Sequence, residues 1–115
     1  MDPQPRGPDW MPVTPKTGSL FHAYSQMMAM DGEYAEAADC FRRVLEQWPE
    51  DAFSRNNLGA CLLEMGRREE AEAHLRAAVR SAPQAAGMVL TSLASASHGR
   101  FFLKPSDAAK FLEKK

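Results

Sequence analysis

The sequence lacks the charge excess and the apolar length that nucleic-acid and membrane contacts require. Its 14 basic and 15 acidic residues give a formal net charge of −1, and no run of Lys and Arg is longer than two residues. Nucleic-acid interfaces carry a basic excess, and membrane-surface contacts carry polybasic clusters. The apolar runs are far shorter than the roughly 20 residues of a transmembrane helix. We therefore expect no nucleic-acid partner and no membrane contact.

Patterns of cysteine, histidine and glycine that support chemistry are also missing. The two cysteines, Cys40 and Cys61, lie inside helical patterns, so we interpret both as small buried side chains of a reducing, cytoplasmic compartment. The histidines share no metal-ligand spacing with each other or with the cysteines. No glycine-rich loop of the P-loop or Rossmann kind occurs. The sequence therefore predicts no cofactor and no enzyme activity.

Residues 1–17 are rich in proline and have no apolar core of the signal-peptide kind. The prolines of this segment are Pro3, Pro5, Pro8, Pro12 and Pro15. Proline lacks a backbone donor and disfavours helix in the residue before it, so we expect a disordered tail. As an alternative, the apolar side chains around Trp10 would dock in a groove of the same copy or of another copy.

From Gly18 onward, apolar residues recur at three- and four-residue spacing, which is the pattern of amphipathic helices. The expected helices are one before Gly32, one carrying the stripe from Tyr34 to Trp48, one from the cap Asp51 to Gly66, one ending at Pro83, and one over about 84–97. No segment shows the sustained alternation of a strand. The sequence therefore predicts an all-α fold.

Five positions recur at a spacing of 34 residues. The pairs are Gly32 and Gly66, Ala37 and Ala71, Phe41 and Leu75, Leu45 and Val79, and Pro49 and Pro83. The glycine lets the chain reverse between antiparallel helices, the alanine lies where the helices cross, and the proline ends the second helix. Such a period predicts helix pairs that must stack to bury their apolar faces.

This pattern resembles the tetratricopeptide repeat family. The family signature falls on Leu58, Gly59, Gly66, Ala71, Leu75, Ala78 and Pro83, and in the preceding repeat on Phe21, Gly32, Tyr34, Ala37, Phe41, Val44 and Pro49. The resemblance implies a right-handed α-α superhelix, a solenoid of antiparallel helix pairs over 18–115, with repeats at 18–51 and 52–85 and a divergent third at 86–115. In the third, Ala108 and Leu112 repeat the Ala37 and Phe41 pairing after a four-residue insertion. Pro105 would start its short last helix, or Ser106 would cap it.

In this family the first helix of each repeat lines a concave face that holds a segment of another protein. Carried over residue by residue, the peptide-binding positions are His22, Gln26, Met30, Phe53, Asn56, Asn57, Ala60, Glu64, Leu90 and Ala94. Spacing independently places four of them on one helical stripe, namely Phe53, Asn56, Ala60 and Glu64. We predict Phe53 as an anchor, because aromatic side chains dominate interface energies. Alternatively, Phe53 packs against the preceding helix or Trp48.

Some members bind the acidic tail of a chaperone through cationic and amide side chains. The matching positions hold His22, Gln26, Gly87 and Thr91 here, and only Asn57 agrees. Without cationic donors the groove suits an apolar or amphipathic peptide. The predicted function is an adaptor or scaffold for a protein segment, and the alternative is a secretion-type chaperone that holds an export substrate.

Two further expectations concern the charged run and the end of the solenoid. We interpret RREEAEAHLR as a solvated helix face, with Glu72 paired to Arg68 and to Arg76 at helical spacing. The open end of the solenoid allows self-association. Phe101 and Phe102 either fold back to cover that end or form an exposed contact patch.

Overall fold

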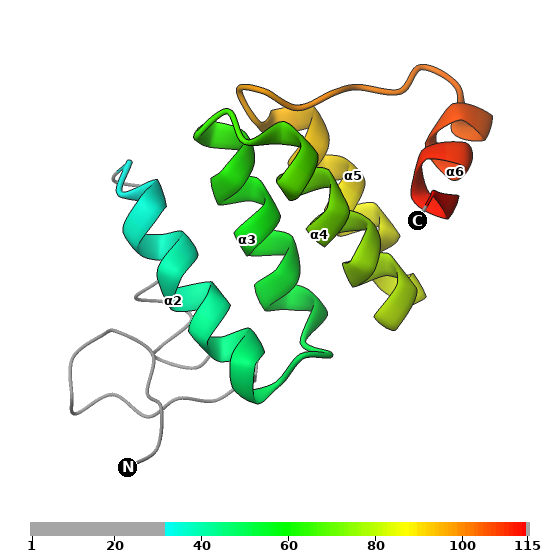
Figure 1. Ribbon diagram of the computed structural model, residues 1–115. Helices are drawn as coiled ribbons and strands as arrows, with labels where there is room; N and C mark the ends of the chain where they lie inside the picture. The colour runs from blue at the N-terminus through cyan, green and yellow to red at the C-terminus, as the bar shows by residue number, and fades with distance from the viewer. Residues whose placement is uncertain (1–31, 115) are drawn as a thin grey trace, which may run out of the picture.

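The computed structural model describes residues 32–114, which form α-helices joined by short turns, with no β-strand among them (Figure 1). The elements are α2 (Tyr34–Gln47), α3 (Ala52–Glu64), α4 (Arg68–Ser81), the 3-10 turn η1 (Pro83–Ala85), α5 (Ala86–Ser95) and α6 (Pro105–Glu113). The all-α prediction is confirmed, and the hand of the superhelix stays a prediction. The expected tail and the expected helix before Gly32 lie outside the described residues.

The chain enters α2 and α4 through glycines with a left-handed backbone. Gly32 has a φ of +85° and Gly66 has a φ of +80°, a conformation that other residues rarely adopt. After α3, the N–H of Arg67 donates to the carbonyl of Leu62 (2.9 Å), and the N–H of Gly66 donates to that of Leu63 (3.0 Å). This pair of bonds is the Schellman motif, which ends a helix and satisfies its last carbonyls. Gly66 therefore has the predicted role in the chain reversal between α3 and α4, and Gly32 has the same backbone conformation.

Helix α3 lies between α2 and α4 (Figure 1) and supplies Leu58, Cys61, Leu62 and Leu63 to the core. A Cβ on Gly59 would lie 2.6 Å from Cγ of Leu75 and 3.2 Å from the carbonyl oxygen of Ala71, so α3 and α4 approach each other closely at this glycine. Ala37 and Ala71 are both fully buried, as the repeat predicts for the residues where paired helices cross. Trp48 packs against the same core.

Helices α5 and α6 follow α4 in the chain, and α6, which contacts α4, starts at Pro105, as predicted. The third repeat over 86–115 stays a prediction. Val89 and Leu93 of α5 are fully buried, and Phe111 of α6 is 3% exposed. The guanidinium groups of Arg76 and Arg100 each lie 5.1 Å from the centre of the Phe111 ring. Cation–π contact of this kind adds to the apolar packing that holds a short helix in place.

The connection between α5 and α6 combines both alternatives proposed for its two phenylalanines. The Phe102 ring is partly buried against the core, 5.3 Å from the Phe111 ring, whereas Phe101 is 72% exposed. Phe102 thus covers the end of the helix stack, and Phe101 faces outward.

The charged run at the start of α4 is not solvated throughout, so that prediction is wrong at Glu72. Glu72 is buried, and its Oε2 accepts from Nε of Arg68 (3.2 Å) and from Nε of Arg100 (2.8 Å). The expected partner Arg76 instead lies over the Phe111 ring. The cause is the segment after Gly99 together with α6, which contacts α4 and brings Arg100 to Glu72. Helical spacing within α4 alone contains no information about that covering element.

Candidate functional site

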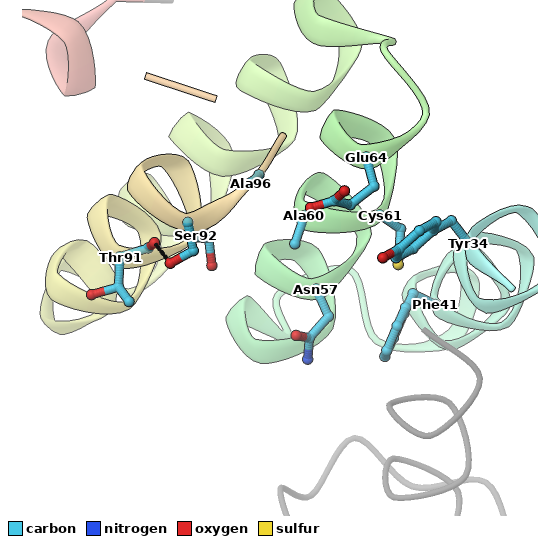
Figure 2. A pocket seen from close by; sticks show the side chains of 10 residues that line it. Tyr34, Phe41, Asn57, Ala60, Cys61, Glu64, Thr91, Ser92 and Ala96 are labelled. Carbon is cyan, nitrogen blue, oxygen red and sulfur yellow. Dashed lines mark hydrogen bonds between the residues drawn. The ribbon is translucent and has the colours of Figure 1, made fainter. Parts of the chain in front are cut away.

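A cleft of about 440 Å³ lies between α3 and α5 and is flanked by the start and middle of α2 (Figure 2). We name it the α3–α5 groove. Its described lining residues are Tyr34, Phe41, Asn57, Ala60, Cys61, Glu64, Thr91, Ser92, Ser95 and Ala96.

Helical geometry explains why these side chains share one cleft. Asn57, Ala60, Cys61 and Glu64 follow one another at intervals of three, one and three residues, so they form one stripe along α3. The facing stripe on α5 consists of small residues between 91 and 96. Because both walls carry small side chains, the space between the two helices stays open.

Adjacent asparagines on α3 have different surroundings. Asn56 is 4% exposed, and its Oδ1 accepts a hydrogen bond from the Ser92 hydroxyl (3.0 Å), which joins α3 to α5. Asn57 lines the groove, and its amide nitrogen Nδ2 is buried without a hydrogen-bond partner among the described residues. A buried donor without an acceptor is costly, since it has lost its hydration. Asn57 is therefore the polar group of the groove that still requires a partner.

Glu64 and the hydroxyl side chains on the α5 wall already have hydrogen-bond partners. The Ser95 hydroxyl donates to the carbonyl of Thr91 (2.7 Å), the bond drawn as a dashed line in Figure 2. The Thr91 hydroxyl donates to the carbonyl of Gly87 (2.9 Å). The carboxylate of Glu64 accepts from the hydroxyl (2.7 Å) and the backbone N–H (3.2 Å) of Ser97. These bonds fix the walls of the groove, and Asn57 lies at one end of the α3 stripe (Figure 2).

The groove has little charge and no reactive thiolate. Burial, together with the nearby Glu64 and Cys40, raises the pKa of the Cys61 thiol to about 11. A thiol with this pKa stays protonated at neutral pH, and the thiolate is the form that attacks electrophiles and binds metals. Glu64 is the single charged side chain among the described lining residues.

The structure brings together only part of the predicted site. Asn57, Ala60 and Glu64 line the groove, and Asn56 is buried beside it. Phe53 is half-buried near the start of α3 and is not among the lining residues. The predicted positions in the first helix, which are His22, Gln26 and Met30, lie outside the described residues.

The predicted place of Leu90 and Ala94 is corrected. Both line a separate apolar pocket with residues 101–105 and Ala108, so they lie on another side of α5. The family resemblance predicted the groove-facing side of α5 from the repeat register alone. In the structure, the segment after Gly99 covers the side of α5 that holds Leu90. The groove is instead lined by the stripe from Thr91 to Ala96. In the sequence, the small hydroxyl residues Thr91, Ser92 and Ser95 at helical spacing indicate this face of α5.

Within residues 32–114, no group of three or more His, Cys, Asp or Glu side chains could hold a metal ion. No helix in the same range has the length and apolar character to cross a bilayer.

Comparison with known proteins adds one match. The family model described as tetratricopeptide repeat matches residues 28–93, which include α2, α3, α4 and most of α5. No characterised protein and no solved structure matches the chain. The matched range contains both crossing alanines, Ala37 and Ala71, and the α3 wall of the groove.

Proposed function

The chain belongs to the tetratricopeptide repeat family, and from this premise we propose that it is a non-catalytic adaptor that holds a segment of another protein in the α3–α5 groove. Repeats of this family generally mediate protein–protein interaction. Both cysteines are buried inside helices, and a reducing, cytoplasmic location belongs to this proposal.

The observation that carries the proposal is the unpartnered amide of Asn57. A peptide lying along α3 would present backbone carbonyls to the groove, and one of them can accept the hydrogen bond from Nδ2 of Asn57. A hydrogen bond of this kind contributes about 0.5–1.5 kcal/mol, and it also removes the penalty of an unsatisfied buried donor. Binding would therefore give the Asn57 amide the hydrogen-bond acceptor that it lacks in the free protein.

The remaining lining residues restrict the chemistry of that segment. The small side chains of Ala60, Ser92 and Ala96 leave room for apolar side chains of modest size. The described walls hold the Glu64 carboxylate and no cation, so an acidic segment would gain no charge-assisted hydrogen bond there. The proposed ligand is an uncharged or weakly basic segment that binds through its backbone and small apolar side chains.

Filling the groove tests the proposal. Ala60→Arg places a long charged side chain between α3 and α5, whereas Ala73→Arg places the same side chain on the exposed face of α4. We expect the Ala60→Arg variant to bind the proteins captured from the native cell extract at least about tenfold more weakly than the wild type does. This corresponds to a loss of about 1.4 kcal/mol of binding free energy. Ala73→Arg should capture them as the wild type does.

A third variant separates binding from folding. Asn57→Leu keeps much of the side-chain volume and removes the unpaired donor, so we expect weaker capture without a loss of stability in thermal unfolding. Equal capture by the wild type, Ala60→Arg and Asn57→Leu would move recognition to another surface.

A secretion-type chaperone is the second candidate, favoured by two apolar side chains that are strongly exposed, Phe101 (72%) and Leu103 (88%). Such a chaperone keeps its substrate unfolded. Limited proteolysis of the captured partner separates the two functions, because an adaptor leaves its partner folded and resistant to cleavage, whereas a chaperone leaves it sensitive.

A further inference from the structure

One end of the α3–α5 groove carries a carboxylate close to an aromatic ring. Glu64 is the last residue of α3 and Tyr34 is the first residue of α2, and both line the groove. A short turn reverses the chain between α2 and α3, so the start of α2 lies level with the end of α3. Figure 2 shows Tyr34 on the Glu64 side of the groove, with Asn57 farther along α3.

The Glu64 carboxylate is held in place but is not neutralised by a cation. Its oxygens accept one hydrogen bond each from Ser97, the hydroxyl on Oε1 and the backbone N–H on Oε2. A carboxylate has about four acceptor positions, so further donors can bind. Within residues 32–114 no basic side chain forms an ion pair with Glu64. The groove therefore presents a fixed negative charge that has no counter-charge in this part of the chain.

Two carboxylates of α4 are by contrast ion-paired. Glu70, which is half-buried like Glu64, lies 2.9 Å from Arg42, and the buried Glu72 lies 2.8 Å from Arg100. Partial removal from water weakens the hydration of a carboxylate and strengthens its attraction to a cation. Glu64 is therefore the partly buried carboxylate at which a cation of a ligand would add a charge-assisted hydrogen bond.

The aromatic ring at this end also favours a cation. The face of an aromatic ring attracts a Lys or Arg side chain that lies within about 6 Å of the ring centre. Tyr34 is half-buried and packs against the core, so its ring is held at the mouth of the groove. A guanidinium or ammonium group placed there would meet the carboxylate and the ring together.

The second fixed point of the groove is the unpartnered amide of Asn57. Asn57 and Glu64 are seven positions apart on α3, which corresponds to about 10 Å along the helix axis. An extended peptide advances about 3.3 Å per residue, so about three residues span this distance. Ala60 lies between the two points, and its small side chain leaves space for the segment.

We infer that the groove recognises a segment in which an arginine or lysine lies about three residues from the residue whose carbonyl accepts from Asn57. The cation would pair with the Glu64 carboxylate and lie against the Tyr34 ring. This inference rests on the proposed function, because it names the chemistry of the segment that the groove holds. Two contacts at a set distance also restrict the register of the segment along α3.

Peptide selection on the full chain tests this chemistry. Phage that display random dodecapeptides are selected on the wild-type protein, and the enriched peptides that the Ala60→Arg variant fails to bind are the groove ligands. We expect an arginine or a lysine in these peptides. In fluorescence anisotropy, replacement of the arginine by citrulline, or of the lysine by norleucine, should weaken binding to the wild type at least about fivefold. The Glu64→Gln variant should bind the basic peptide more weakly by a similar factor.

The two changes should not add. After Glu64→Gln has removed the carboxylate, the basic and the neutral peptide should bind almost equally, because each change removes the same ion pair. Tyr34→Leu should weaken the binding of the basic peptide more than that of the neutral one. The matched control is Glu113→Gln, which removes an exposed carboxylate of α6 outside the groove and should bind both peptides as the wild type does. The peptide change is measured on the wild-type protein, so it does not depend on the stability of a variant.

The possible outcomes separate this inference from the proposed function. Groove ligands without a basic residue, or additive effects of Glu64→Gln and the neutral peptide, would overturn the inference and leave the proposed function intact. If no enriched peptide is sensitive to Ala60→Arg, both are overturned. A dimer in sedimentation velocity that Glu64→Gln dissociates would also overturn the inference, because the occupant would then be a second copy of this chain.

Discussion

Single small residues determine how closely the helices of this protein approach each other. Gly32 and Gly66 are required for their positive φ, whereas Gly59 is required for space, since a Cβ there would lie 2.6 Å from Cγ of the buried Leu75. Gly87 has neither constraint, because no atom lies within 4 Å of the place where its Cβ would be. The same residue type therefore has three physical roles in one short chain.

Substitution of glycine by alanine should have opposite effects at Gly59 and Gly87. In a helix this change ordinarily stabilises by about 0.5–1 kcal/mol, because alanine loses less backbone entropy on folding. We expect that gain at Gly87, which is exposed in α5. At Gly59 the overlap with Leu75 should instead destabilise by about 1–3 kcal/mol. Urea unfolding measures both, and a gain at both positions would show that α3 and α4 are not in close contact there.

Residue roles that depend on neighbouring helices were not predictable from the sequence. Asn56 and Asn57 are adjacent and equally polar, yet one is bonded to Ser92 and the other is unpartnered in the groove. Glu72 has the pattern of a surface residue and is buried under Arg100. In each case the deciding group comes from a residue 28 or more positions later in the chain, which no local period records.

At the scale of elements, α6 is the helix that depends most on its surroundings. It spans nine residues, and helices this short are marginal in water unless they pack on a neighbour. Its main anchor is Phe111, which is surrounded by Phe102 and the guanidinium groups of Arg76 and Arg100. The ion pair between Arg100 and Glu72 links this cluster to α4.

Two changes from phenylalanine to alanine separate anchoring from exposure. Phe111→Ala removes a side chain that is 3% exposed and should destabilise by about 3–5 kcal/mol, lowering the melting temperature by at least about 10 °C. Phe101→Ala removes one that is 72% exposed and should change stability by less than about 0.5 kcal/mol. Thermal unfolding followed by circular dichroism distinguishes them, and equal melting temperatures would mean that α6 does not contribute to the fold.

Most element boundaries were predictable, whereas the faces of α5 were not. Glycines and prolines at the 34-residue period predicted where α2, α3 and α4 end, and Pro105 predicted the start of α6. For α5 the apolar stripe is compatible with several rotations about the helix axis. The insertion after Gly99 decides between them, since it covers the Leu90 side and leaves the Thr91 side facing α3.

For the whole molecule, the stacking of helix pairs creates two recessed surfaces. The α3–α5 groove exists because α3 and α5 contact each other through small side chains, and the apolar pocket beside Leu90 exists because the segment after Gly99 runs from α5 to α6. Each surface is built from residues of more than one element. Anything that separates paired helices should therefore damage folding before it changes a single binding contact.

The most direct test of this architecture is the free energy of unfolding in urea for three alanine-to-leucine variants. Ala37 and Ala71 are fully buried at the equivalent positions of two repeats, whereas Ala73 is exposed on α4. Paired helices that cross at these alanines predict a loss of about 1–3 kcal/mol for Ala37→Leu and for Ala71→Leu, with Ala73→Leu within about 0.5 kcal/mol of the wild type. Equal stability of all three variants would contradict the crossing of the helices at Ala37 and Ala71, and with it the stacked helix pairs.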